Sequence, residues 1–332
     1  MRAFSYFAPK TVEEACGILR TEESSFALAG GTDLLVSVKR GTARAKALVD
    51  LKGIPELQRL EVKDGGGLWI GAAVPLYVLE GDPNVRRLYP AVALAAENIA
   101  SYQIRNRGTV GGNLCLDTRC WYYNLGDLGS TAFLDCRKRG GETCYAVRGG
   151  DRCYAIMSAD LVPALVALEA KVAIAGGNHG LRTLALEDFY TGDGVSPNVL
   201  QRGEVLVGVE VPGAQNLRAS YLKYHWRRSI DFGLATLAAA VRLDDRGTIT
   251  AARLVLGGVN SAPVRARHAE ELLVKGLAPE EIATEAAKET NIFSGVFASV
   301  GYRKRLVRVL VEDAVTKMVD DINGHTGKIG RS

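Results

Sequence analysis

Four cysteines in one stretch of the chain are the residues best suited to binding a metal. Their spacing is C-x15-C-x7-C-x8-C, and they are Cys120, Cys136, Cys144 and Cys153. Sets of four thiolates bind zinc and iron–sulfur clusters alike, so the ligand type does not separate these metals. The spacing differs from a ferredoxin run and from paired CxxC knuckles. The sequence therefore predicts either a four-thiolate site or a group of core thiols.

Two glycine turns precede the cysteines, and both have residue types that suit a phosphate. The first is AGGTDL at residues 29–34, and the second is TVGGN at residues 109–113. Glycines let backbone N–H groups approach a pyrophosphate closely, and the start of a helix adds partial positive charge. Neither turn is GxGxxG or GxxxxGK[ST], which disfavours Rossmann and P-loop folds. Each turn fits a phosphate-bearing cofactor or an ordinary strand-to-helix connection.

Composition argues against nucleic-acid and membrane partners. The chain has 332 residues, is 47% hydrophobic and carries a net charge of +4, which is too small to indicate nucleic-acid binding. It contains no run of about 18 apolar residues. The N-terminus lacks the pattern of a secretory signal. We therefore expect a cytoplasmic protein with reduced cysteines.

Hydrophobic periodicity predicts an α+β chain. A composition shift at residues 212–216 predicts a boundary, and we expect three parts, over residues 1–55, 56–214 and 215–325. The predicted helices cover residues 12–20, 90–100, 161–168, 265–275, 279–290 and 301–321. The predicted strands cover residues 26–29, 47–51, 60–62, 68–73, 171–175, 204–211, 220–225, 234–243 and 248–257. Valines alternate along 204–211, which predicts a half-buried strand. Thr11 and Glu14 form a capping-box pattern at the first helix.

Several motifs resemble the FAD-binding subunits of the xanthine oxidase, or molybdenum hydroxylase, family. They are AGGTDLL, TVGGNLC, SADLVPAL, GEVLVGVEVP and LKYHWRRSIDF, and they span nearly the whole chain. The resemblance implies a two-part, PCMH-like FAD-binding domain. It also implies a C-terminal α+β domain of the CO dehydrogenase flavoprotein type with a three-stranded antiparallel sheet.

The resemblance also implies which residues contact FAD. The pyrophosphate would lie against one run of residues: Ala27, Leu28, Ala29, Gly30, Gly31, Thr32, Asp33 and Leu34. From the other side it would meet Thr109, Gly111, Gly112 and Asn113. Asp160 would bond ribityl or ribose hydroxyls, Lys223 would lie near the isoalloxazine ring, and Leu206 would contact the flavin. Without the resemblance, Asp160 reads as a helix N-cap, Lys223 as a solvated charge and Leu206 as a core residue.

The segment over residues 115–157 is inserted relative to most subunits of that family. Its DTRC, YYN and later RC motifs resemble the beta subunits of 4-hydroxybenzoyl-CoA reductases. This resemblance implies a [4Fe–4S] cluster bound by the four cysteines, with Tyr123 or its neighbour Tyr122 against the flavin. Cys16 and Cys115 are expected to be core thiols. Lys138 and its arginine neighbours would form a basic rim that attracts a ferredoxin-like donor.

No catalytic constellation for a substrate is found in this chain, so it reads as an electron-transfer subunit. The resemblance implies a heterotrimer, expected to dimerise, with a molybdenum-cofactor large subunit and a [2Fe–2S] small subunit. The implied reaction is reductive dehydroxylation of 4-hydroxybenzoyl-CoA. The alternatives are a molybdenum hydroxylase that oxidises an aromatic or N-heterocyclic substrate, and a non-catalytic zinc-binding scaffold.

Overall fold

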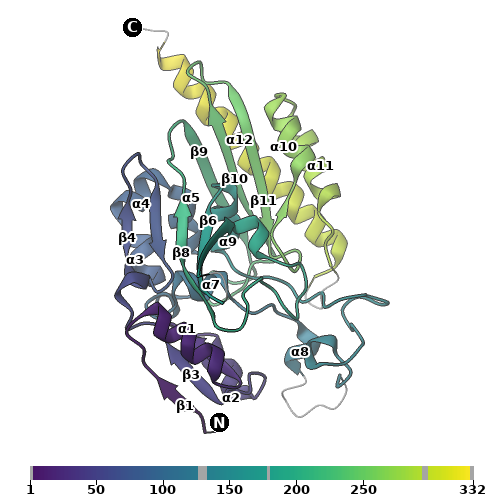
Figure 1. Ribbon diagram of the computed structural model, residues 1–332. Helices are drawn as coiled ribbons and strands as arrows, with labels where there is room; N and C mark the ends of the chain where they lie inside the picture. The colour runs from purple at the N-terminus through teal and green to yellow at the C-terminus, as the bar shows by residue number, and fades with distance from the viewer. Residues whose placement is uncertain (1–2, 126–132, 178–179, 294–297, 330–332) are drawn as a thin grey trace.

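The computed structural model describes residues 3–125, 133–177, 180–293 and 298–329. Within these residues the chain forms sheets of three, five and four strands, which follow one another along the sequence (Figure 1). None of the helices in this described part is long and apolar enough to cross a membrane.

The first sheet is parallel and is built from short strands joined by helices. Its elements are β1 (Ser5–Phe7), α1 (Val12–Thr21), β2 (Ser25–Leu28), α2 (Leu34–Arg40) and β3 (Ala47–Asp50), in the strand order β1-β3-β2. Thr11 caps α1, because its hydroxyl accepts a 3.1 Å hydrogen bond from the amide of Glu14. The turn at 29–34 lies at the carboxyl end of β2, where it joins the strand to α2.

The second sheet is antiparallel and has the order β4-β5-β8-β6-β7. Its strands are β4 (Leu60–Val62), β5 (Leu68–Gly71), β6 (Lys171–Gly176), β7 (Leu181–Ala185) and β8 (Glu204–Val211). The prediction that β8 is half-buried was wrong, since six of its eight residues are buried. The reason is that α1 packs on one face of this central strand while the large core covers the other.

A series of short helices lies between β5 and β6 in the chain, and most of them contribute to the large core that also contains residues of the second sheet. They are α3 (Leu76–Gly81), α4 (Pro83–Leu88), α5 (Pro90–Glu97), α6 (Tyr102–Arg105), α7 (Val110–Leu114) and α9 (Leu161–Ala167). All seven residues of α9 are buried, which places its start, at Asp160, deep in the fold. The segment between α7 and α9 carries only α8 (Trp121–Leu125) and a short 3-10 turn (Arg137–Arg139) in its described residues, and Figure 1 shows α8 apart from the sheets.

The C-terminal sheet lies between two layers of helices (Figure 1). It contains β9 (Leu217–Tyr224), β10 (Ala235–Leu243), β11 (Ile249–Gly257) and β12 (Val264–Arg265), in the order β12-β11-β10-β9. On one face pack α10 (Arg267–Val274), α11 (Pro279–Glu289) and α12 (Val300–Ile329), and on the other α5 and α9. Alternate residues of β10 pack into different hydrophobic cores. Leu237 faces α10, α11 and α12, and Ala238 faces the large core that also contains residues of the second sheet.

The expectation of three strands in the C-terminal sheet was wrong by one strand. Val264 and Arg265 pair with Leu256 and Val255 to form the two-residue β12. A strand of two residues carries no periodicity, and the helix predicted over 265–275 includes the second of them, Arg265. The addition leaves the position of β9 unchanged at the opposite edge of the sheet, where it contacts α5.

Candidate functional site

A cavity of about 540 Å³ lies where the two glycine turns meet. This volume is in the range of small-molecule sites. Most of the predicted FAD contacts line it: Ala27, Ala29, Gly30, Gly31, Thr32, Asp33, Leu34, Thr109, Gly111, Gly112, Asn113, Asp160 and Leu206. Leu28 instead packs in a small core beside α2, and neither Tyr123 nor Lys223 is a lining residue. Turns about eighty residues apart in the chain therefore form one site.

Close backbone contact between the turns explains why the first one needs Gly30. A Cβ atom at this position would lie 2.0 Å from the carbonyl oxygen of Arg107 and 2.8 Å from the Cα of Gly108. Gly31 is needed for a different reason, because its φ of +73° is in the left-handed region. Gly30 therefore permits the contact between the turns, which shapes the cavity wall, and Gly31 permits the left-handed backbone of the first turn.

The second turn is fixed by its own polar side chains. The hydroxyl of Thr109 caps α7 by accepting a 3.1 Å hydrogen bond from the amide of Gly112. Asn113 accepts a 3.1 Å hydrogen bond from the amide of Leu161 and so attaches α7 to the start of α9. Both side chains, which the sequence suggested as cofactor donors, thus also bond to the protein.

Asp160 forms a buried ion pair with Lys223 rather than capping α9. The ammonium of Lys223 lies 2.8 Å from one carboxylate oxygen of Asp160, and the hydroxyl of Tyr221 donates to the other at 2.8 Å. The two charged side chains are 5% and 1% exposed, which excludes the solvated role considered for Lys223. Burial raises the pKa of Asp160, and the Lys223 charge opposes that rise.

Sequence reasoning missed Tyr221, although its position carried a signal. Tyr221 and Lys223 are two apart on β9, so their side chains leave the same face of the strand. Burial and the adjacent Asp160 carboxylate raise the pKa of the Tyr221 hydroxyl well above its usual value. Tyr221 therefore stays protonated and donates to Asp160.

The segment over residues 115–157, predicted to be an insertion, supplies part of the cavity wall. Cys115, Leu116, Asp117 and Arg119 all line the cavity. Arg119 forms an ion pair with Asp33 of the first turn, and its guanidinium lies 5.0 Å from the ring centre of Phe232. Burial raises the pKa of Asp33, while the Arg119 charge acts against this rise. The insertion is thus in direct contact with the turn that the resemblance assigns to FAD.

The four predicted metal ligands are neighbours but do not converge. Cys136 and Cys153 are buried, and Cys120 and Cys144 are half-buried. Burial raises the pKa of Cys120, and the thiols of Cys136 and Cys144 add to this rise. However, no set of three or more His, Cys, Asp or Glu side chains in the described residues is arranged to hold a metal ion. In this conformation the cysteines therefore do not form a ligand set.

The basic residues beside the cysteines are largely used within the fold. The Lys138 side chain is 5% exposed and pairs with Asp117 at 2.6 Å, and it also lies 5.3 Å from the Tyr123 ring centre. Arg139 donates to the carbonyl oxygen of Tyr123 and lies 5.2 Å from the same ring centre. Lys138 is therefore a structural cation and does not belong to an exposed docking rim.

Arg303, in the first turn of α12, is also buried. Its guanidinium donates to the carbonyl oxygens of Leu234, Gly258 and Phe293. Burial lowers its pKa to about 10. Arg303 thus joins three loops of the C-terminal domain.

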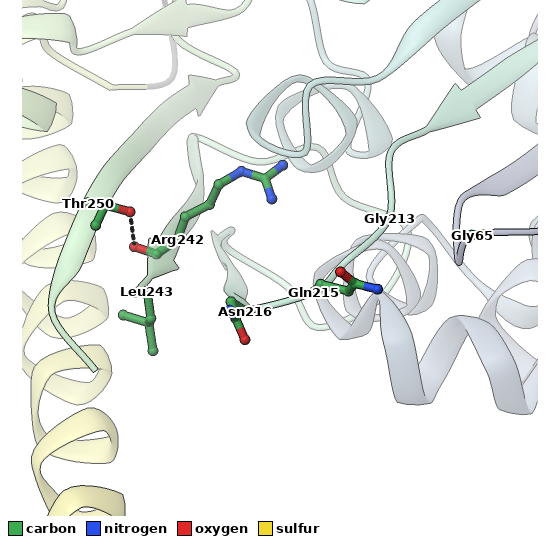
Figure 2. Close-up of a pocket in the computed structure, with 7 residues that line it drawn as sticks. All are labelled: Gly65, Gly213, Gln215, Asn216, Arg242, Leu243 and Thr250. Atoms are coloured by element: carbon green, nitrogen blue, oxygen red, sulfur yellow. Dashed lines mark hydrogen bonds between the residues drawn. The ribbon is translucent and has the colours of Figure 1, made fainter. Parts of the chain in front are cut away.

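A second, more polar cavity of about 350 Å³ lies at the far end of β10 (Figure 2). It contains none of the predicted site residues and is lined by Gly65, Gly213, Gln215, Asn216, Arg242, Leu243 and Thr250. Its one charged lining group, Arg242, already pairs with Glu169 at 3.0 Å. The cavity at the glycine turns is therefore the stronger candidate.

Comparison with known proteins points to the same cavity. Residues 2–214 match the sequence model of the FAD binding domain in molybdopterin dehydrogenase, and residues 220–318 match the CO dehydrogenase flavoprotein C-terminal domain. The first match includes every cavity-lining residue except Ile230, Asp231 and Phe232. The cavity thus lies almost entirely within the region similar to FAD-binding domains.

Individual relatives align along most of the chain. The nicotinate dehydrogenase FAD-subunit of Eubacterium barkeri is 28% identical over 98% of this chain and 99% of its own. The aldehyde oxidoreductase FAD-binding subunit PaoB of Escherichia coli (strain K12) is 33% identical, over 83% and 87%. The crystal structure of quinoline 2-oxidoreductase from Pseudomonas putida 86 gives a TM-score of 0.74 at 26% identity, covering 95% of this chain and 96% of that one.

Proposed function

Because the chain belongs to the family of FAD-binding domains of molybdopterin dehydrogenases, we propose that it is the flavin subunit of an enzyme that oxidises an aromatic or N-heterocyclic substrate. Family membership confirms the expected FAD-binding domain and the CO dehydrogenase-type C-terminal domain. The single observation that carries the proposal is the cavity, which joins both glycine turns to the buried Asp160.

The residues around the cavity fit FAD by their chemistry. The backbones of residues 30–34 and 109–113 would hold the pyrophosphate, and Asp160 would accept from a sugar or ribityl hydroxyl. Leu76, Ile104 and Leu206 would exclude water from the isoalloxazine ring. When bound, FAD would supply the redox chemistry that protein side chains lack.

Oxidation has more support than the reductive activity on 4-hydroxybenzoyl-CoA. The relatives described above are named nicotinate dehydrogenase, aldehyde oxidoreductase and quinoline 2-oxidoreductase. Two of them are named as subunits, which supports partners that carry the substrate site. We propose a molybdenum-cofactor large subunit and a [2Fe–2S] small subunit as these partners, with an external carrier, a ferredoxin among the candidates, exchanging electrons with the complex.

Absorbance of the purified chain tests the flavin assignment. We expect the two absorption bands typical of flavins, at about 370 and about 450 nm, and we expect dithionite to bleach them. Denaturation should release about one FAD per chain. An apo preparation should regain these bands when FAD is added. A colourless chain that takes up no FAD would contradict the assignment.

A second candidate function is a [4Fe–4S] cluster held by the four cysteines. The thiols of Cys136 and Cys144 both raise the pKa of Cys120, which favours the cluster because it places these three thiols close together. The absence of a ligand set among the described residues counts against it, so we attach no electron-transfer step to the cluster. Zinc remains the alternative metal.

Replacing Cys144 by Ser tests this second candidate. Cys144 is half-buried, so the change should disturb the fold little while removing one ligand. We expect about four iron and four sulfide per wild-type chain purified without oxygen, and almost none in Cys144→Ser. FAD should remain bound in the variant. Zinc in the wild-type chain, or metal retained in Cys144→Ser, would rule out this cluster.

A further inference from the structure

The cavity at the glycine turns is rich in carboxylates and poor in cations. Five acidic residues line it, namely Asp33, Asp117, Asp160, Glu204 and Asp231. Among its described lining residues only Arg119 has a cationic side chain. A cofactor with a doubly charged pyrophosphate would bind poorly beside uncompensated carboxylates, because like charges at short range repel strongly in a partly desolvated site.

Each of these carboxylates has a cationic partner. Four of the partners are cations that do not line the cavity. The pairs are Asp117–Lys138, Asp160–Lys223, Glu204–Arg182 and Asp231–Arg227. The fifth carboxylate, Asp33, lies in the first glycine turn and pairs with Arg119, which does line the cavity.

Arg119 is held in place by contacts that use only part of its guanidinium. Its backbone exchanges hydrogen bonds of 2.7 and 2.8 Å with Ile156 at the end of the insertion, and its guanidinium lies 5.0 Å from the Phe232 ring centre. The Arg119 side chain is 28% exposed, and among the described residues its guanidinium donates a hydrogen bond to Asp33 from one terminal nitrogen. A guanidinium can bond a carboxylate and a phosphate together, because its donors point in different directions.

We propose that Arg119 is a binding residue for the FAD pyrophosphate, neutralising Asp33 and donating a further hydrogen bond from its guanidinium to a phosphate oxygen. This inference rests on the proposed flavin function. It assigns the cysteine-bearing segment a role in FAD binding that does not depend on a metal. Arg119 directly precedes Cys120, so order in the insertion and affinity for FAD become linked through one side chain.

The test compares dissociation constants for FAD and for riboflavin, which has no phosphate. Arg119→Gln should weaken FAD binding about a hundredfold and change riboflavin binding by less than about threefold. Adding Asp33→Asn removes the carboxylate that Arg119 neutralises. The Asp33→Asn/Arg119→Gln double variant should therefore return to within about tenfold of wild-type affinity for FAD.

Arg107→Gln is the matched control. Arg107 is exposed and lies beside the second turn, so this change removes one positive charge without touching the cavity lining. It should leave FAD affinity within about twofold. Equal loss of FAD and riboflavin in Arg119→Gln, or a double variant no better than the single one, would assign Arg119 a purely structural role and overturn the inference. Failure of the wild-type chain to bind FAD would instead refute the proposed function.

Discussion

Gly30→Ala is expected to abolish FAD binding and to lower the free energy of unfolding by about 4 kcal/mol or more. The added Cβ would lie 2.0 Å from the Arg107 carbonyl oxygen, 2.7 Å from its carbonyl carbon and 2.8 Å from the Gly108 Cα. All three are backbone atoms, so no side-chain rotation can relieve the contact. The two turns must separate, and the cavity that they form opens. FAD content and urea unfolding of the purified variant measure both effects.

Gly17→Ala provides the control for this substitution. Gly17 lies inside α1, and a Cβ at this position would meet nothing within 4 Å. Alanine favours the helix over glycine, so we expect unchanged FAD content and a gain of about 0.5–1 kcal/mol. If Gly30→Ala bound FAD as well as Gly17→Ala does, the close contact between the turns would not define the site.

The bounds of helices and strands could be predicted well for elements whose whole length lies in one kind of environment. The strand predicted at 204–211 has the same bounds as β8, and the helix at 279–290 is one residue longer than α11. The degree of burial was less predictable, because alternating valines on β8 do not reveal that α1 covers the second face. Strand order also depends on contacts distant in sequence, such as that between β5 and β8.

The candidate site could be predicted as a set of residues but not as a set of interactions. Thirteen of the sixteen predicted cofactor contacts line the cavity, because glycine motifs are local signals. Their charge partners come from other parts of the chain. Lys223 is 63 positions from Asp160, and Arg119 is 86 positions from Asp33. No local pattern indicates such pairs, and the sequence marks Arg119 only as part of the DTRC motif that ends at Cys120.

Lys223→Met is expected to be the second strongly damaging change. It removes the ammonium from an ion pair whose carboxylate, on Asp160, is 5% exposed. An uncompensated buried charge costs about 3–5 kcal/mol, and we expect this loss of stability at pH 8. The double variant Lys223→Met/Asp160→Asn should recover most of it, because the amide carries no charge. A residual loss of about 1 kcal/mol would reflect the hydrogen bond from Lys223 to the Asn98 carbonyl oxygen.

The pH dependence separates this charge effect from simple loss of packing at Lys223. Burial already raises the pKa of Asp160 in the folded chain above its unfolded value, and Lys223 limits the rise. Without Lys223 the folded pKa must rise further, so the folded variant binds a proton more tightly than the unfolded chain. The stability deficit of Lys223→Met should therefore be small near pH 4 and grow as the pH rises through the folded pKa of Asp160. Urea unfolding at several pH values measures this deficit. The double variant has no ionisable side chain at position 160, so its deficit should not grow with pH in this way. A deficit that stays constant with pH in the single variant would mean that Lys223 stabilises the fold through packing alone. The ionised Asp160 carboxylate would then not need the positive charge of Lys223.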